Sequence, residues 1–178
     1  DLNIELYDHL LSRAAIEKAL GRIRRLFGPK PVKPPEALQQ PDARVVQWAL
    51  SEGPTLARRV EAAKAVIRGP AFYDGPVSLE AFMVLEQCLQ IASLPYHPAW
   101  IDFTSFHSAL PEDSSQSLLR AAADARVNPF LEFFKARVLP DLHRDRPALV
   151  GISIPTLGQM LAGVTLGRPR SRGVRPWE

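Results

Sequence analysis

The sequence has little cysteine and no long apolar run. Cys88 is the single cysteine among 178 residues, so this stretch holds no internal disulfide, cysteine-bound zinc site or iron–sulfur cluster. No segment approaches 18 uninterrupted apolar residues, so we expect no membrane span. The opening residues lack the basic and apolar regions of a signal peptide. With 46% hydrophobic and 23% charged residues, the composition is typical of a soluble globular domain, and we expect a cytoplasmic location.

Positive and negative charges balance outside the last eleven residues. The net charge is +3, and the Arg/Pro-rich tail 168–178 carries four arginines and one glutamate, which is the whole excess. A nucleic-acid partner would need a basic face, whereas a few arginines in a short tail are usually solvated. We therefore expect no nucleic-acid partner.

Helical periodicity dominates the middle of the chain. Apolar residues recur every three or four positions after Ser12, and the proline-rich segment 28–42 follows as a linker. Further helices are expected at about 45–50, 54–68, 78–92, 114–126 and 129–144. Gly53-Pro54 separates the first two of these, Gly69 ends the second, Ser78 caps the third, and Asn128-Pro129 begins the last.

The last third of the chain changes character. Residues 148–154, Ala-Leu-Val-Gly-Ile-Ser-Ile, form a short apolar run that suits a strand buried in a parallel sheet. Thr156 and Gln159 fit a capping box for a helix up to about Leu166. This strand, tight turn and helix predict one unit of a Rossmann-like α/β sheet.

The two ends of the chain resemble a known family. DLNIELYDHLLS is similar to the end of the second Rossmann strand in cobalamin-binding radical-SAM proteins, and NPFLEFFKARVLPDLHRDRPALVGISI with PTLGQMLAGVTL is similar to the third strand and its helix. Within this family the resemblance is to cobalamin-dependent enzymes of the type that mature ribosomal peptides. The matching covers residues 1–12 and 126–166. The family's first, fourth and fifth strands and its C-x-x-x-C-x-x-C motif have no counterpart here, so the resemblance implies a truncated piece.

The resemblance implies a cofactor site at the carboxyl end of the expected strand. Cobalamin would lie against residues from both ends of the chain: Asn3, Ser153, Ile154, Pro155, Thr156 and Gln159. The other interpretation is that Thr156 and Gln159 only cap their helix. S-adenosylmethionine and a 4Fe–4S cluster would belong only to the missing part. No catalytic residue and no metal ligand is expected in this chain.

The long loop 94–115 offers a weaker candidate. His97 and His107 flank Trp100, Asp102 and Phe103 there, and such residues are found in substrate sites. Histidines in loops of this kind are more often packing or surface residues. No histidine spacing typical of a metal site occurs. Cys88 is expected to be a small buried apolar residue, and Phe130, Phe133 and Phe134 are expected to be core.

These observations predict a mostly α fold of about six helices with a remnant of a parallel, Rossmann-like sheet. Residues 1–12 and 145–167 would form a partial cobalamin-binding unit, and 13–144 a helical insertion. The expected function is a corrinoid-binding and substrate-positioning fragment of a cobalamin-dependent radical-SAM enzyme, inactive alone, with a peptide or small-molecule substrate. The alternative is a non-catalytic helical interaction domain.

Overall fold

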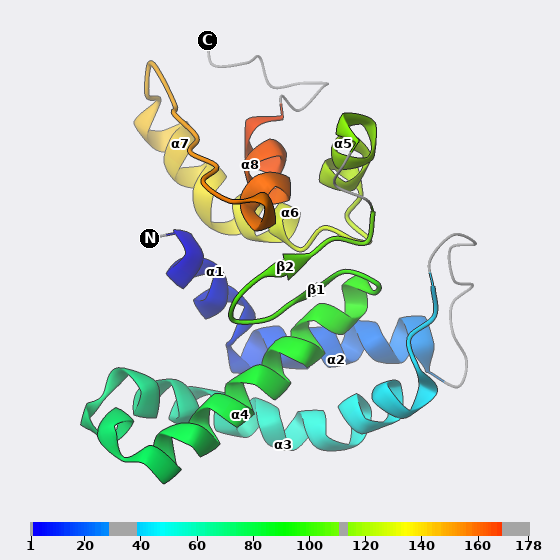
Figure 1. The fold of residues 1–178 in the computed structure, drawn as a ribbon, viewed down its shortest axis with the longest axis vertical. Coiled ribbons are helices and arrows are strands. Elements are labelled where there is room, and N and C mark those ends of the chain that lie inside the picture. The colour runs from blue at the N-terminus through cyan, green and yellow to red at the C-terminus, as the bar shows by residue number, and fades with distance from the viewer. Residues whose placement is uncertain (1, 29–38, 111–113, 169–178) are drawn as a thin grey trace. The chain divides into compact units, whose positions relative to one another are not determined.

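The computed structural model describes residues 2–28, 39–110 and 114–168 (Figure 1). Most of these residues are helical, which confirms the expected mostly α fold. Two compact units divide the chain, Asp1–Ser105 and Phe106–Glu178. Segments 1–12 and 145–167, expected to share one α/β unit, therefore belong to different units. Most of the expected linker 28–42 and nearly all of the expected tail 168–178 lie outside the described residues.

Unit 1 is built on three packed helices. Its elements are α1 (Leu2–Leu10), α2 (Arg13–Phe27), α3 (Ala43–Arg68), η1 (Pro70–Tyr73), α4 (Gly75–Ser93), η2 (Leu94–Tyr96) and β1 (Trp100–Ile101). Helices α2, α3 and α4 pack against one another (Figure 1). Their buried faces supply the core residues Ile16, Leu20, Ile23, Val46, Ala49, Leu56, Val60, Leu85, Cys88 and Leu89. Helix α2 begins after Ser12, as the sequence predicted, and the Ser12 hydroxyl accepts a hydrogen bond from the Ala15 amide.

The expected break at Gly53-Pro54 is wrong, because α3 runs through it without interruption. Pro54 has no amide hydrogen for the Leu50 carbonyl, which costs the helix one bond. The apolar stripe of α3 continues across this position, however, from Ala49 to Leu56. A Cβ at Gly53 would clash with the Leu20 side chain, so the glycine lets α2 and α3 approach closely here. Tertiary packing therefore outweighs the local breaker.

Residues 2–10 form a helix and not the end of a strand. Leu6 and Leu10 of α1 are buried, and they are four positions apart on one helical face. A helix satisfies its own backbone groups within the segment, whereas a strand needs a neighbour. The strand expected from the resemblance is wrong in this structure.

The helix expected at 78–92 is α4, and it begins earlier than predicted. Asp74 caps α4 by accepting the Val77 amide at 3.3 Å, and Pro76 lies in the first turn. Ser78, the predicted cap, lies inside the helix and donates to the Gly75 carbonyl. Gly69 ends α3 as predicted.

Unit 2 is a smaller helical cluster. Its elements are β2 (Phe106–His107), α5 (Ser115–Ala123), α6 (Phe130–Phe133), η3 (Phe134–Val138), α7 (Leu139–Asp145), η4 (Leu157–Gln159) and α8 (Met160–Gly167). The expected helix 129–144 is present with a π-helical turn, η3, in its middle. Pro140 cannot donate to the Ala136 carbonyl, and the wider turn accommodates that loss. Phe130, Phe133 and Phe134 are buried as predicted.

The remnant of a parallel sheet is not found among the described residues. Residues 149–155 are in neither helix nor strand. The sheet that is described is a two-stranded antiparallel one, β1 with β2. An isolated strand has no partner for its amides and carbonyls, so a strand-like sequence without neighbours does not form a ladder. The prediction of a parallel strand at 148–154 is therefore wrong here.

One helical stretch passes a length and composition test for crossing a membrane. It is Gly75–Tyr96, within the described residues, and half of its most apolar window is buried inside the protein. Its buried residues pack against α2 and α3, which is the behaviour of a core helix.

Candidate functional site

The expected cofactor segment runs beside α8 in unit 2. A Cβ at Gly163 would meet the Ile154 side chain, and one at Gly167 would lie 3.3 Å from Ile152 Cδ1. Ile154 thus covers the middle of α8 and Ile152 its end, so the segment and the helix run in opposite directions. This is the path of a strand and its following helix, without the hydrogen-bonded ladder.

The other side of this segment is uncovered. Leu149 is 88% exposed, and Ile152 and Ile154 keep 38% and 41% of their surfaces in solvent although they contact α8. Apolar side chains of this size are usually covered in a finished core. The segment therefore exposes large apolar side chains on a side that no described residue covers.

The expected capping box is wrong. The backbone amide of Gln159 donates to the Thr156 carbonyl at 3.1 Å, which closes the 3₁₀ turn η4. No side chain caps α8. Ser153 and Thr156 are exposed, and within the described part of the chain their hydroxyls form no hydrogen bond. Gln159 is half-buried, and its side-chain amide likewise forms no hydrogen bond with the described residues.

Five of the six expected cofactor residues are close together because they are neighbours in the sequence. Ser153, Ile154, Pro155 and Thr156 are consecutive, and Gln159 ends the next turn. Asn3 lies in α1, which belongs to the other unit. Asn3 and the segment Ser153–Gln159 therefore belong to different units.

The described part of unit 2 lacks the paired strands of a Rossmann-type cofactor site next to Ser153 and Thr156. Ligands of an open α/β sheet bind at the carboxyl ends of its paired parallel strands, at the point where the strand order reverses. Here no paired strand orients Ser153 and Thr156, and the preceding residues are solvent-exposed. We assign no step of cobalamin chemistry to them.

Hydrogen bonds hold the loop that contains His97 in place. Asp102 uses its carboxylate to build a turn, since Oδ1 accepts the amides of Thr104 and Ser105 at 2.6 and 2.7 Å. The Tyr7 hydroxyl donates to the Asp102 carbonyl at 2.8 Å, and burial, assisted by the Asp102 charge, raises the pKa of Tyr7. Burial lowers the pKa of His97. His107 belongs to unit 2, so the suspected substrate cluster does not form one site within either unit.

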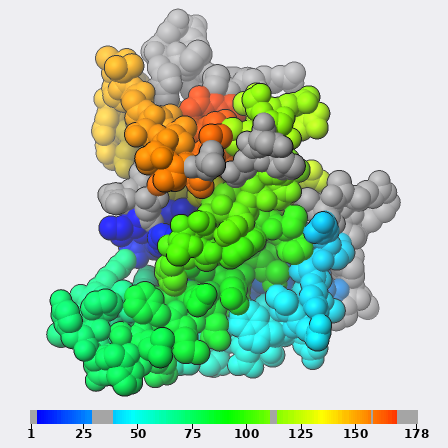
Figure 2. All heavy atoms as spheres, in the orientation of Figure 1, coloured from blue at the N-terminus to red at the C-terminus, as the bar shows by residue number. Residues whose placement is uncertain are grey.

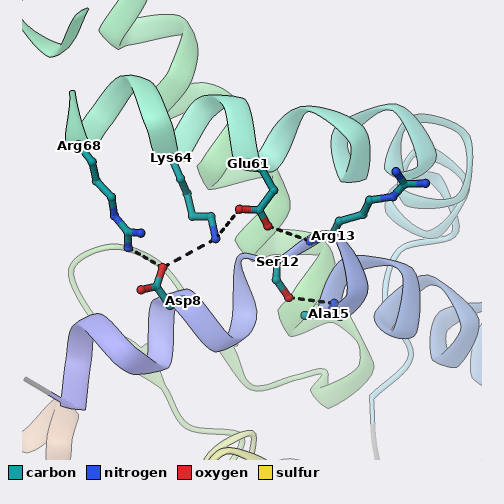
Figure 3. A network of polar contacts seen from close by, with 7 residues as sticks. All are labelled: Asp8, Ser12, Arg13, Ala15, Glu61, Lys64 and Arg68. Carbon is teal, nitrogen blue, oxygen red and sulfur yellow. Dashed lines mark hydrogen bonds and ion pairs between the residues drawn. The ribbon is translucent and has the colours of Figure 1, made fainter. Parts of the chain in front are cut away.

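A charge network connects α1, α2 and α3 (Figure 3). Asp8 contacts Lys64 at 3.8 Å and also pairs with Arg68, while Lys64 lies 2.8 Å from Glu61. Glu61 accepts the Arg13 amide at the start of α2, where a negative charge is favourable. Each carboxylate faces a cation or an amide, so the network stabilises helix packing and offers no free acid or base.

The sequence interpretation missed the outer surface of α4. Leu79 and Phe82 are 62% and 40% exposed, whereas Leu85 and Leu89 of the same helix are buried. The signal lay in the sequence: the segment 77–85 is apolar on more than one helical face.

No cluster of metal-ligating side chains is found in the part of the chain that is described. No group of three or more histidine, cysteine, aspartate or glutamate side chains there could hold a metal ion. No protein-family model, curated protein or solved structure matches this chain.

Proposed function

We propose that this chain is a non-catalytic part of a cobalamin-dependent radical-SAM enzyme. In this proposal residues 148–154 pair with strands from outside the chain, and the loop 153–156 then faces the corrinoid. The observation that carries it is the uncovered apolar segment that runs back along α8 through Ile152 and Ile154. The sequence resemblance at 126–166 supports the same assignment.

The residues present limit which cofactors this chain could bind in such an enzyme. A single buried cysteine cannot hold a 4Fe–4S cluster, so the cluster and S-adenosylmethionine would be bound elsewhere in the enzyme. The protein supplies binding and orientation to such cofactors, while the cofactor carries the hard chemistry. Our proposal gives this chain the positioning of corrinoid and of a peptide or small-molecule substrate. The same proposal places it in the cytoplasm, where a lone reduced thiol is ordinary.

The flanking coding sequence and a binding experiment test the proposal. A C-x-x-x-C-x-x-C motif is expected downstream in the same gene region. The longer protein, mixed with hydroxocobalamin and passed through gel filtration, should keep the visible corrinoid bands in its peak. Replacing Ser153 and Thr156 with alanine together should weaken that retention, whereas Thr55→Ala on α3 should not. A protein peak without corrinoid bands would contradict the assignment.

A second candidate is a helical interaction domain unrelated to that family. The observation that favours it is the absence of strand structure at 149–155 in the described chain. It predicts that hydrogen exchange at amides 149–155 stays fast in the longer protein. The enzyme proposal predicts slow exchange there, because those amides would be paired in a sheet.

A further inference from the structure

The outer surface of unit 1 has an apolar face along η1 and α4. Six large apolar side chains between positions 72 and 83 are exposed: Phe72, Tyr73, Val77, Leu79, Phe82 and Met83. Their exposed fractions run from 39% for Val77 to 89% for Tyr73. The face continues inward through ring contacts, since Phe82 meets Phe72 at 6.3 Å and Phe103 at 6.1 Å between centroids. In Figure 2 the first turns of α4 lie uncovered at the lower left.

Part of this face lies on one straight stripe of α4. Leu79, Met83, Glu86 and Gln90 are spaced four, three and four residues apart and all are exposed, the first two apolar and the last two polar. At 1.5 Å per residue the stripe is about 16 Å long, the length of about three helical turns. The side chains on such a stripe form the ridges into which another helix packs.

The segment that carries this face contributes charged side chains of one sign only. Residues 70–93 contain Asp74, Glu80 and Glu86 and no lysine or arginine, although the whole chain is net positive. Glu80 pairs with Arg59, but Glu86 is exposed and forms no ion pair with the described residues. An apolar stripe with acidic neighbours is complementary to an apolar stripe with basic neighbours.

We propose that the η1–α4 face is a docking surface for a basic amphipathic helix of a partner protein. Apolar side chains of that helix pack on Leu79, Phe82 and Met83, and its lysines or arginines lie near Glu86. A second copy of this chain is disfavoured, because a two-fold contact would set the same acidic residues against each other. Anionic lipid or nucleic acid would be repelled for the same reason. This proposal does not depend on the cofactor assignment.

A pair of model peptides tests the proposal on the complete chain. The first is a fluorescein-labelled 18-residue helix with leucines on one face and lysines beside them, and the second has glutamate at every lysine position. Fluorescence anisotropy at physiological salt should show saturable one-to-one binding of the lysine peptide. The glutamate peptide should bind at least about tenfold more weakly. Equal binding of both peptides, or no binding, would overturn the proposal.

Surface variants locate the contact. The double variant Leu79→Gln with Met83→Gln should weaken binding of the lysine peptide about tenfold or more, and Glu86→Lys should weaken it about threefold and improve binding of the glutamate peptide. Leu119→Gln on α5 is the matched control, because Leu119 is 51% exposed and lies in the other unit. It should bind like the unmodified chain. Circular dichroism checks that each variant is folded, and hydrogen exchange should show protection at 77–90 when peptide is bound.

Two results of these experiments would show that a basic helix does not bind this face specifically. If sedimentation shows a dimer that Leu79→Gln with Met83→Gln abolishes, the face binds a second copy and the proposal is wrong. If Leu119→Gln weakens the lysine peptide as much as the α4 variants, the peptide adheres without a site, and the proposal is equally wrong.

Discussion

Asn128 and Thr165 form a buried hydrogen bond that connects the start of α6 to α8. The Asn128 Nδ2 atom donates to Thr165 Oγ1 at 2.8 Å, and both side chains are buried. The same amide group donates to the Ala121 and Ala122 carbonyls at 3.3 Å, while its Oδ1 accepts the Phe130 amide at 3.0 Å. One fully buried side chain thus ties α5, α6 and α8 together.

Removing the hydroxyl partner should destabilise unit 2. Thr165→Val leaves the Asn128 amide short of one acceptor in a buried place, which costs about 1–3 kcal/mol. Hydrogen exchange of peptides covering α5 and α6 measures the loss. A cycle with Asn128→Ala should show non-additive effects of at least about 0.5 kcal/mol. Strictly additive losses would mean that the two side chains do not interact.

Acid should weaken unit 2 through Asp124. A side-chain hydrogen bond from Arg126 lowers the pKa of Asp124, and the two groups lie 2.6 Å apart. Because the folded pKa is below the unfolded value of about 3.9, this stabilisation is present above that pH. It disappears as the pH falls through the lowered folded pKa. Its size should be below about 1 kcal/mol, since Arg126 is half exposed.

The comparison of Arg126→Gln with the unmodified chain tests this expectation. The variant should be less stable at pH 7, and the difference in unfolding free energy should shrink as the pH falls below about 4. Arg120→Gln, on the exposed side of α5, should leave the pH dependence unchanged. A gap that persists at low pH would rule out the Asp124 carboxylate as its source.

Local signals predicted much of the helical structure. Ser12, Gly69 and Asn128-Pro129 mark real helix ends, because capping depends on groups within a few residues of each other. Phe130, Phe133 and Phe134 were recognised as core for the same reason, since their spacing defines one helical face. None of these inferences needed knowledge of the rest of the fold.

What failed depended on distant neighbours. The apolar run 148–154 is strand-like in composition, but a strand exists only with a partner to bond to. Conversely, Gly53-Pro54 is a breaker by composition, yet contacts of α3 with Leu20 carry the helix through it. Grouping Asn3 with Ser153–Thr156 depended on the same sheet, because only paired strands would place residues so far apart in the sequence side by side.

The Gly53 contact predicts opposite effects for two glycine substitutions. Gly53→Ala forces a methyl group into Leu20, and overpacking of this kind costs about 1–3 kcal/mol. Gly21→Ala meets nothing within 4 Å in α2, so it should stabilise the protein by about 0.5–1 kcal/mol through helix propensity. Urea midpoints measure both. Adding Leu20→Val should recover part of the Gly53→Ala loss, and an equal shift in the same direction for both glycines would disprove the contact.

Cys88 should be chemically silent in the folded protein. Burial raises the pKa of its thiol to about 12, against a smaller opposing effect from Arg59, and its Sγ lies 3.8 Å from the Leu56 carbonyl. At pH 8 only about one thiol in ten thousand is then ionised, and the thiolate is the reactive form. Native chain should therefore react with Ellman's reagent far more slowly than chain in urea. Ser51→Cys, at an exposed position of α3, provides the control, because its added thiol should react at once while Cys88 does not. If Cys88 reacts as fast as that added thiol, then the three-helix core of unit 1 opens readily, and the docking surface that rests on α4 would open with it.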